Sequence, residues 1–108
     1  PLTASFVLMY ASMCSGLPEA WAPIGPMQTV DDVTPPLFVN GTADPATPLV
    51  GASAMQGFFP GARMVTVPSG QHGIYPWARS TCVNEAATAY LLTATSPAAD
   101  IACPATTG

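Results

Sequence analysis

Two short apolar runs, each followed by a loop and a helix-like pattern, constrain the fold of this chain more than any other feature. Residues 37–40 read Leu-Phe-Val-Asn, a continuous apolar run of the kind found in strands that are buried on both faces. Residues 63–67 read Arg-Met-Val-Thr-Val, a β-branched run that Pro68 ends. We therefore predict a short strand at each run.

A helix is predicted after each strand. Thr47-Pro48 offers a hydroxyl for the helix N-cap and a proline for the first helical position. Apolar residues then recur at steps of three or four, so one face of this helix should pack inward; they are Leu49, Ala52, Met55 and Phe59. The second helix is predicted from Ser80 or Thr81 to about Thr93, and its apolar side consists of Val83, Ala86, Ala87, Tyr90 and Leu91.

The alternation of strand, loop and helix is typical of parallel strands with crossover helices, so the predicted fold class is α/β. Two strands do not form a stable sheet alone, and we expect the remaining strands in sequence upstream of residue 1. Charged residues make up only 7% of the chain, whereas they are about a quarter of a typical soluble domain. The chain is therefore expected to bury much of its surface against missing sequence and to be incomplete on its own.

The first 34 residues carry weaker signals. The segment from Phe6 to Met13 is apolar and fits either a buried strand or a short helix, and glycines and prolines between residues 16 and 26 then interrupt regular structure. We interpret residues 1–34 as a connector from a missing upstream region and residues 35–108 as one α/β segment. The apolar segment is too short to span a bilayer and follows no positive residue, so neither a membrane span nor a signal peptide is predicted.

Charge and cysteine content exclude several classes of function. The only positive residues are Arg63 and Arg79, too few for a phosphate-binding patch, so no nucleic-acid partner is expected. No cysteines have the Cys-x-x-Cys spacing of a metal site, and neither a metal nor a cofactor is predicted. Cys82 and Cys103 flank the second helix and a proline-containing turn, which suits a disulfide in an oxidising compartment. Buried free thiols are the alternative reading. If Cys82 and Cys103 are paired, the odd cysteine count leaves Cys14 unpaired within this chain.

Asp44 and His72 are the residues most suited to chemistry. Each lies in the loop after a predicted strand, where open α/β sheets place their reactive groups. Because adjacent parallel strands end at the same edge, the two loops should lie side by side. An aspartate that accepts the Nδ1 proton of a histidine fixes its tautomer and stabilises the imidazolium formed in catalysis. The alternatives are that Asp44 only shapes a turn and that His72 is only a polar loop residue.

The chain offers no convincing nucleophile. The Gly-x-Ser-x-Gly elbow of α/β-hydrolases is absent, and its nearest counterpart, Gly51-Ala-Ser53-Ala-Met55, follows no strand. Nothing around Cys14 resembles an elbow either. A nucleophile and its oxyanion-hole amides are therefore expected upstream.

The residues around Asp44 and His72 resemble a known family. Residues 36–48, PLFVNGTADPATP, and residues 62–75, ARMVTVPSGQHGIY, followed by the two late cysteines, resemble the C-terminal TAP-like domain of α/β-hydrolases, a group that includes secreted tripeptidyl aminopeptidases. The resemblance implies that Asp44 is the catalytic acid, that His72 is the catalytic base and that Cys82 pairs with Cys103. Gln71 departs from the family, which usually has glycine before the histidine.

The function that the resemblance implies is that of a secreted serine hydrolase, an exopeptidase for peptide substrates, of which this chain supplies the acid and the base. The chain alone is expected to be inactive and to need the missing N-terminal part of the same hydrolase as its partner. An esterase or lipase acting on small esters is an alternative, because the fold does not fix the substrate. A truncated, non-catalytic segment is the alternative from a different class.

Overall fold

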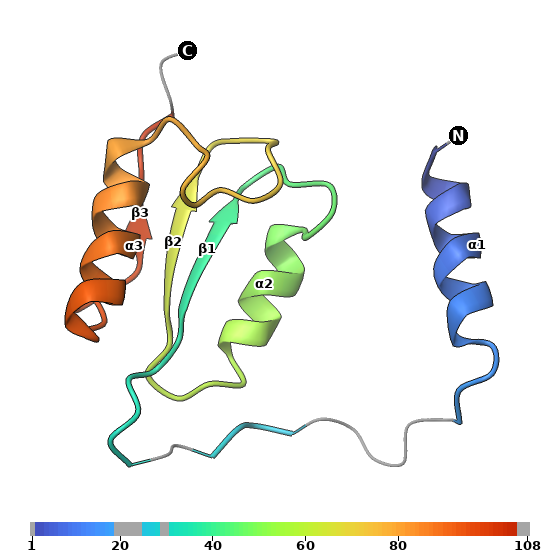
Figure 1. Ribbon diagram of the computed structural model, residues 1–108, viewed down its shortest axis with the longest axis horizontal. Helices are drawn as coiled ribbons and strands as arrows, with labels where there is room; N and C mark the ends of the chain where they lie inside the picture. Colours follow the sequence, from blue (N-terminus) through green and yellow to red (C-terminus); the bar gives the residue numbers. More distant parts are fainter. Residues whose placement is uncertain (1, 19–24, 29–30, 106–108) are drawn as a thin grey trace.

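The computed structural model describes residues 2–18, 25–28 and 31–105. Within these residues the chain forms three helices and three strands, which are labelled in Figure 1. In chain order they are α1 (Leu2–Cys14), β1 (Leu37–Gly41), α2 (Leu49–Gln56), β2 (Arg63–Val67), α3 (Thr81–Thr93) and β3 (Ile101–Ala102). The two predicted strands and the two predicted crossover helices are all present, and the fold is α/β as predicted.

The described strands form one parallel sheet in the order β1-β2-β3. Gly41 at the end of β1 lies beside Val67 at the end of β2, so the loops that follow start from the same edge. The sequence analysis missed β3, because the pair Ile101-Ala102 is too short to show a strand pattern. This third strand lies downstream of the first two, whereas the additional strands were expected upstream.

The hydrophobic core lies between β2 and α3. Val65 and Val67 of β2 and Val83 of α3 have no exposed surface, and they pack with Ile74, Ala78 and Cys103. Burying a valine side chain stabilises a fold by about 1.5–3 kcal/mol, so this small cluster contributes a large share of the stability of the sheet. The core therefore lies directly beneath the loop that carries His72.

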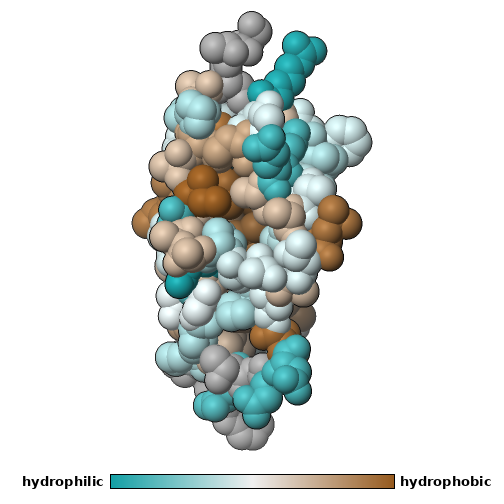
Figure 2. All heavy atoms as spheres, turned by 90° about the vertical axis from the view of Figure 1, so that its left-hand side faces the viewer, coloured by the Kyte–Doolittle hydropathy of each residue, from teal (hydrophilic) through white to brown (hydrophobic). Residues whose placement is uncertain are grey.

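Helix α3 begins as predicted, because Ser80 is its N-cap and the Ser80 hydroxyl accepts a hydrogen bond from the Val83 N–H. Its apolar side is narrower than predicted, since Leu91 is exposed. The last turn of α3 lies beside residues before β1, where the Tyr90 hydroxyl donates to the Pro35 carbonyl. Figure 2 views the α3 side and shows scattered apolar side chains among more polar ones.

Helix α2 differs from the prediction in two ways. Its N-cap is Pro48, with no side-chain hydrogen bond, so Thr47 is not the N-cap. No residue of α2 is fully buried, and Met55 is 44% exposed, so the predicted inward face is only partly covered. The physical reason is that α2 packs mainly against β1, which is the edge strand of the described sheet. Phe59, after the helix, contacts Phe38 with ring centroids 6.0 Å apart.

The apolar segment near the N-terminus is helical, so the buried-strand alternative is wrong. Helix α1 lies apart from the sheet in Figure 1. The described side chains of α1 are exposed, among them Val7, Leu8 and Met13. No helix in residues 2–18, 25–28 and 31–105 is long and apolar enough to cross a membrane.

A disulfide joins Cys82 in α3 to Cys103 just after β3, as predicted, with the two Cα atoms 5.8 Å apart. The Cys103 N–H also donates to the Thr66 carbonyl of β2. The C-terminal strand is thus attached to the fold by a covalent bond and by the sheet. Cys14 is an exposed free thiol at the end of α1.

Candidate active site

The loops after β1 and β2 contact each other backbone to backbone. The Thr42 N–H donates to the Val67 carbonyl at 2.9 Å, and the Ala43 N–H donates to the Ser69 carbonyl at 3.0 Å. A glycine is required at position 41, because a Cβ there would lie 2.7 Å from the Ser69 carbonyl oxygen. The parallel register and this close approach together place the tips of the two loops side by side.

Asp44 is buried at the tip of the first loop, with 5% of its surface exposed. Its Oδ1 accepts hydrogen bonds from the N–H groups of Ala46 at 2.8 Å and Thr47 at 3.1 Å. Its Oδ2 accepts from the Thr47 hydroxyl at 2.7 Å. The carboxylate thus closes an Asx-type turn on its own loop, and both of its oxygens are held.

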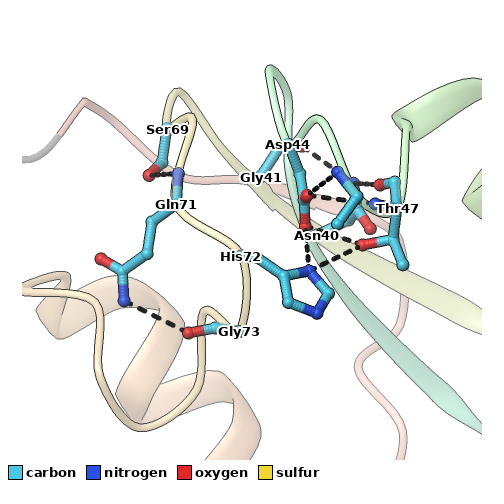
Figure 3. Close-up of polar contacts among 9 residues, drawn as sticks. Asn40, Gly41, Asp44, Thr47, Ser69, Gln71, His72 and Gly73 are labelled. Atoms are coloured by element: carbon cyan, nitrogen blue, oxygen red, sulfur yellow. Dashed lines mark hydrogen bonds and ion pairs between the residues drawn. The ribbon is translucent and has the colours of Figure 1, made fainter. Parts of the chain in front are cut away.

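His72 meets Asp44 from the second loop. Its Nδ1 lies 2.9 Å from Asp44 Oδ2, while the second ring nitrogen points away from the carboxylate (Figure 3). The side chain of His72 is 61% exposed, whereas that of Asp44 is 3% exposed. An ionised carboxylate only accepts hydrogen bonds, so this contact requires a proton on Nδ1 and leaves Nε2 as the free, basic nitrogen of the neutral ring.

The hydrogen bonds of Asp44 stabilise its ionised form. The Thr47 hydroxyl has the largest effect in holding the pKa of Asp44 well below its ordinary value of 3.8. Burial acts in the opposite direction, and the bonds from His72 and from the backbone of Ala46 and Thr47 lower the pKa further. The acid therefore carries a full negative charge at neutral pH, which is the state that orients a histidine.

Asn40 is a polar residue of the site that the sequence analysis did not single out for chemistry. It is buried at the end of β1, and its Nδ2 donates to the carbonyls of Gly41 at 2.8 Å and Thr47 at 3.2 Å. Asn40 thereby ties the far end of the Asp44 loop to the strand. An asparagine that ends an apolar run before a glycine is the only sequence signal that pointed to it.

Two side-chain hydrogen bonds within the His72 loop brace the backbone around the histidine. The Ser69 hydroxyl accepts from the Gln71 N–H at 3.0 Å, and Gln71 Nε2 donates to the Gly73 carbonyl at 3.3 Å. Gly73 has a φ of +74°, a left-handed conformation that favours glycine. Gln71 therefore bridges the two sides of the histidine.

The other candidates from the sequence lie elsewhere. Ser53 is inside α2 and not at a strand end, and Cys14 ends α1. Among the residues that the structure describes, no group of three His, Cys, Asp or Glu side chains is placed to hold a metal ion. The polar centre at this edge of the sheet is thus the pair of Asp44 and His72 with Thr47 beside it.

Comparison with known proteins agrees with the fold. The family described as "TAP-like protein" matches residues 2–103. A tripeptidyl aminopeptidase from Streptomyces lividans is 33% identical over 78 residues, which are 71% of this chain and 14% of that protein. The chain thus spans about a seventh of the length of this relative. No solved structure matches the chain significantly. With residues 2–103 matched and a parallel α/β sheet in place, the chain belongs to the TAP-like family of α/β-hydrolases.

Proposed function

We propose that this chain is the C-terminal segment of a serine hydrolase, in which Asp44 is the acid and His72 is the base of a catalytic triad. The observation that carries the proposal is the 2.9 Å contact between Asp44 Oδ2 and His72 Nδ1 at the carboxyl edge of a parallel sheet. The serine and the oxyanion hole would come from sequence outside these residues. In support, the Gly-x-Ser-x-Gly elbow is absent from the 108 residues.

Each residue has a defined role in this mechanism. The serine hydroxyl attacks the substrate carbonyl carbon while His72 Nε2 takes its proton, and Asp44 stabilises the imidazolium that forms. The tetrahedral intermediate then expels the leaving group, which receives that proton from His72, and an acyl-enzyme remains. Water attacks the acyl-enzyme with His72 again as the base, and the proton returns to the serine as the acid product leaves.

An exopeptidase is the preferred substrate class. The support is the likeness to a protein named tripeptidyl aminopeptidase, so the expected substrate is a peptide with a free amino terminus. An esterase that acts on small esters is the alternative, because the same triad cleaves both bond types. The part of the enzyme that would select between them lies outside the Asp44 and His72 loops.

The remaining features of the proposal concern organisation and compartment. We propose that residues 1–34 connect the serine-bearing part of the hydrolase to the segment from residue 35 onward. The partly covered α2 and the exposed α1 provide apolar surface for such a part. The disulfide between Cys82 and Cys103 favours a secreted enzyme, because disulfides persist in oxidising compartments.

The test is an assay of the longer polypeptide that carries these residues together with a serine elbow. We expect a fluorophosphonate probe to label one serine, and we expect cleavage of a chromogenic tripeptide amide with a free amino terminus. His72→Ala should abolish both probe labelling and turnover. Asp31→Asn removes a charge from the exposed connector and is the matched control, with wild-type rates expected.

The outcomes separate the alternatives. Faster cleavage of a short-chain ester than of the tripeptide amide would replace the exopeptidase with an esterase. Wild-type hydrolysis by the His72→Ala variant would refute the triad. A polypeptide that carries a serine elbow yet neither reacts with the probe nor cleaves either substrate would favour the non-catalytic segment.

A further inference from the structure

The Thr47 hydroxyl lies between the acid and the base. Its Oγ1 is 2.7 Å from Asp44 Oδ2 and 3.4 Å from His72 Nδ1 (Figure 3). We propose that Thr47 is a positioning residue that sets the direction in which Asp44 meets His72 and holds the histidine in its Nδ1–H tautomer. This inference rests on the proposed function for its catalytic meaning, although the tautomer itself does not depend on a nucleophile.

The first step is the orientation of the carboxylate. The two backbone N–H groups that bind Asp44 both donate to Oδ1. These two bonds alone do not fix the position of Oδ2, which can change as the carboxylate rotates. Within the described residues, the Thr47 hydroxyl and His72 are the two groups that bind Oδ2. Of these, only Thr47 belongs to the same loop as Asp44. The hydroxyl therefore fixes the plane of the carboxylate before the histidine arrives.

The second step is the count of protons. A threonine hydroxyl has one hydrogen to donate, and the short contact to a buried carboxylate oxygen assigns that hydrogen to Asp44. Only a lone pair of the Thr47 oxygen then faces His72 Nδ1. With Asp44 Oδ2 and Thr47 Oγ1 both acting as acceptors, Nδ1 must carry the proton. The unprotonated nitrogen is then Nε2, as a general base requires.

The third step is the rigidity of Thr47. Its N–H donates to Asp44 Oδ1, and its carbonyl accepts from Asn40 Nδ2 of β1 at 3.2 Å. Pro48 follows, and a residue before proline is confined to extended backbone conformations. The β-branched side chain of threonine also has few χ1 rotamers. The hydroxyl is thus connected to the sheet through Asn40 and presented to Asp44 in a fixed direction, although Thr47 itself is at the surface.

The test compares three variants of similar size. Thr47→Val keeps the shape and removes the hydroxyl, and Thr47→Ser keeps the hydroxyl. Thr42→Val is the matched control, because Thr42 is an exposed threonine of the same loop whose hydroxyl makes no hydrogen bond within the described chain. The chain has one histidine, so the ¹⁵N resonances of labelled histidine report the tautomer of His72 alone.

The expected result is an Nδ1–H majority in wild type, Thr47→Ser and Thr42→Val. In Thr47→Val the Asp44 carboxylate can rotate about its bound Oδ1, so Oδ2 meets His72 Nδ1 for less of the time and the Nδ1–H share falls below that of the other three. An unchanged tautomer population in Thr47→Val would overturn the proposal, and so would a wild-type chain already dominated by the Nε2–H form. Circular dichroism and thermal melting of each variant check that the fold is kept. This readout requires no catalysis and so stands apart from the proposed function.

Kinetics in the serine-bearing polypeptide supply the second readout. Thr47→Val should lower kcat by about 10- to 100-fold with little change in KM, the loss expected when a reacting group is displaced by about 1 Å. Thr47→Ser should recover most of this loss. A Thr47→Val variant with wild-type kcat would refute the positioning role even if hydrolysis depends on His72. Hydrolysis that does not depend on His72 would instead refute the proposed function and leave the tautomer result intact.

Discussion

The two loops that form the site are held in different ways. Asp44 is almost completely buried, and both carboxylate oxygens are bound by its own loop, which Asn40 ties to β1. His72 is mostly exposed, and the described groups on its ring are Asp44 and Thr47. The position of the Asp44 carboxylate is therefore set by its own loop, and the position of the His72 ring is set by its contact with that carboxylate. Changes to Asp44 itself should affect both stability and chemistry, whereas changes to His72 should affect chemistry alone.

The largest expected effect is the loss of kcat on substitution of Asp44 or His72, and melting temperatures then distinguish the buried acid from the exposed base. In the serine-bearing polypeptide, Asp44→Asn and His72→Ala should each lower kcat by about 10⁴-fold, because the histidine is left in the wrong tautomer or is absent. A second comparison uses alanine at both positions, and the melting temperature of Asp44→Ala should be lower than that of His72→Ala. Asp44→Ala leaves two backbone N–H groups and a hydroxyl without their acceptor, so it should melt earlier. Equal melting temperatures would remove the distinction between the loops.

The second effect concerns the disulfide between Cys82 and Cys103, which stabilises the α3 and β3 region next to the His72 loop. Replacing both Cys82 and Cys103 with serine removes a link across a sequence separation of 21 residues. The free energy of unfolding should fall by about 3 kcal/mol. Hydrogen exchange should rise first in α3, β3 and the loop at residues 69–77, and later in the Asp44 loop. Cys14→Ser is the control and should leave both measurements unchanged, because Cys14 is an exposed free thiol.

A smaller effect tests the anchor of the Asp44 loop. Asn40→Ala removes two hydrogen bonds from a buried site and leaves the Gly41 and Thr47 carbonyls without them. We expect the free energy of unfolding to fall by about 1–3 kcal/mol, measured by urea denaturation. Thr42→Val, in the same loop but exposed, should be neutral. A stable Asn40→Ala variant would show that the Asp44 loop does not depend on the strand.

The most gradual effect is the response to acid. Hydrogen bonds hold the pKa of Asp44 below its ordinary value of 3.8, so its ionised form stabilises the fold at every pH above that value. This contribution is lost as the pH falls below 3.8, where the unfolded chain takes up the proton first. The Met64 N–H, with help from Gln56, likewise lowers the pKa of Asp100. The melting temperature of the wild-type chain should therefore fall steeply as the pH drops below 3.8, and that of Asp44→Asn should fall less steeply.

The sequence predicted the parts of the structure that short-range patterns determine. The apolar runs of β1 and β2 and the hydroxyl cap of α3 lie where they were predicted. The proximity of Asp44 and His72 also followed, because the carboxyl ends of adjacent parallel strands share one edge. Whether the two residues are catalytic stays a prediction.

Other features depend on contacts that no local pattern encodes. Strand β3 has two residues, and it is held in place by pairing with β2 and by the disulfide between Cys103 and α3. Thr47 was predicted to be a helix cap, since a hydroxyl before proline is a common helix start. The N-cap is instead Pro48, one residue later, and the Thr47 hydroxyl donates to the carboxylate of Asp44. Leu91 and Met55 follow the helical period and are nonetheless exposed, because periodicity does not reveal how far the sheet extends.

The register of β1 and β2 has a practical consequence for engineering. Both loop tips are positioned by strand ends that lie side by side, and the turn between α2 and β2 is at the opposite edge of the sheet (Figure 1). Gly57, Pro60 and Gly61 in that turn are exposed. A peptide tag inserted there is expected to leave the distance between carboxylate and imidazole unaltered. The turn is thus a place to attach a reporter without redesigning the chemistry.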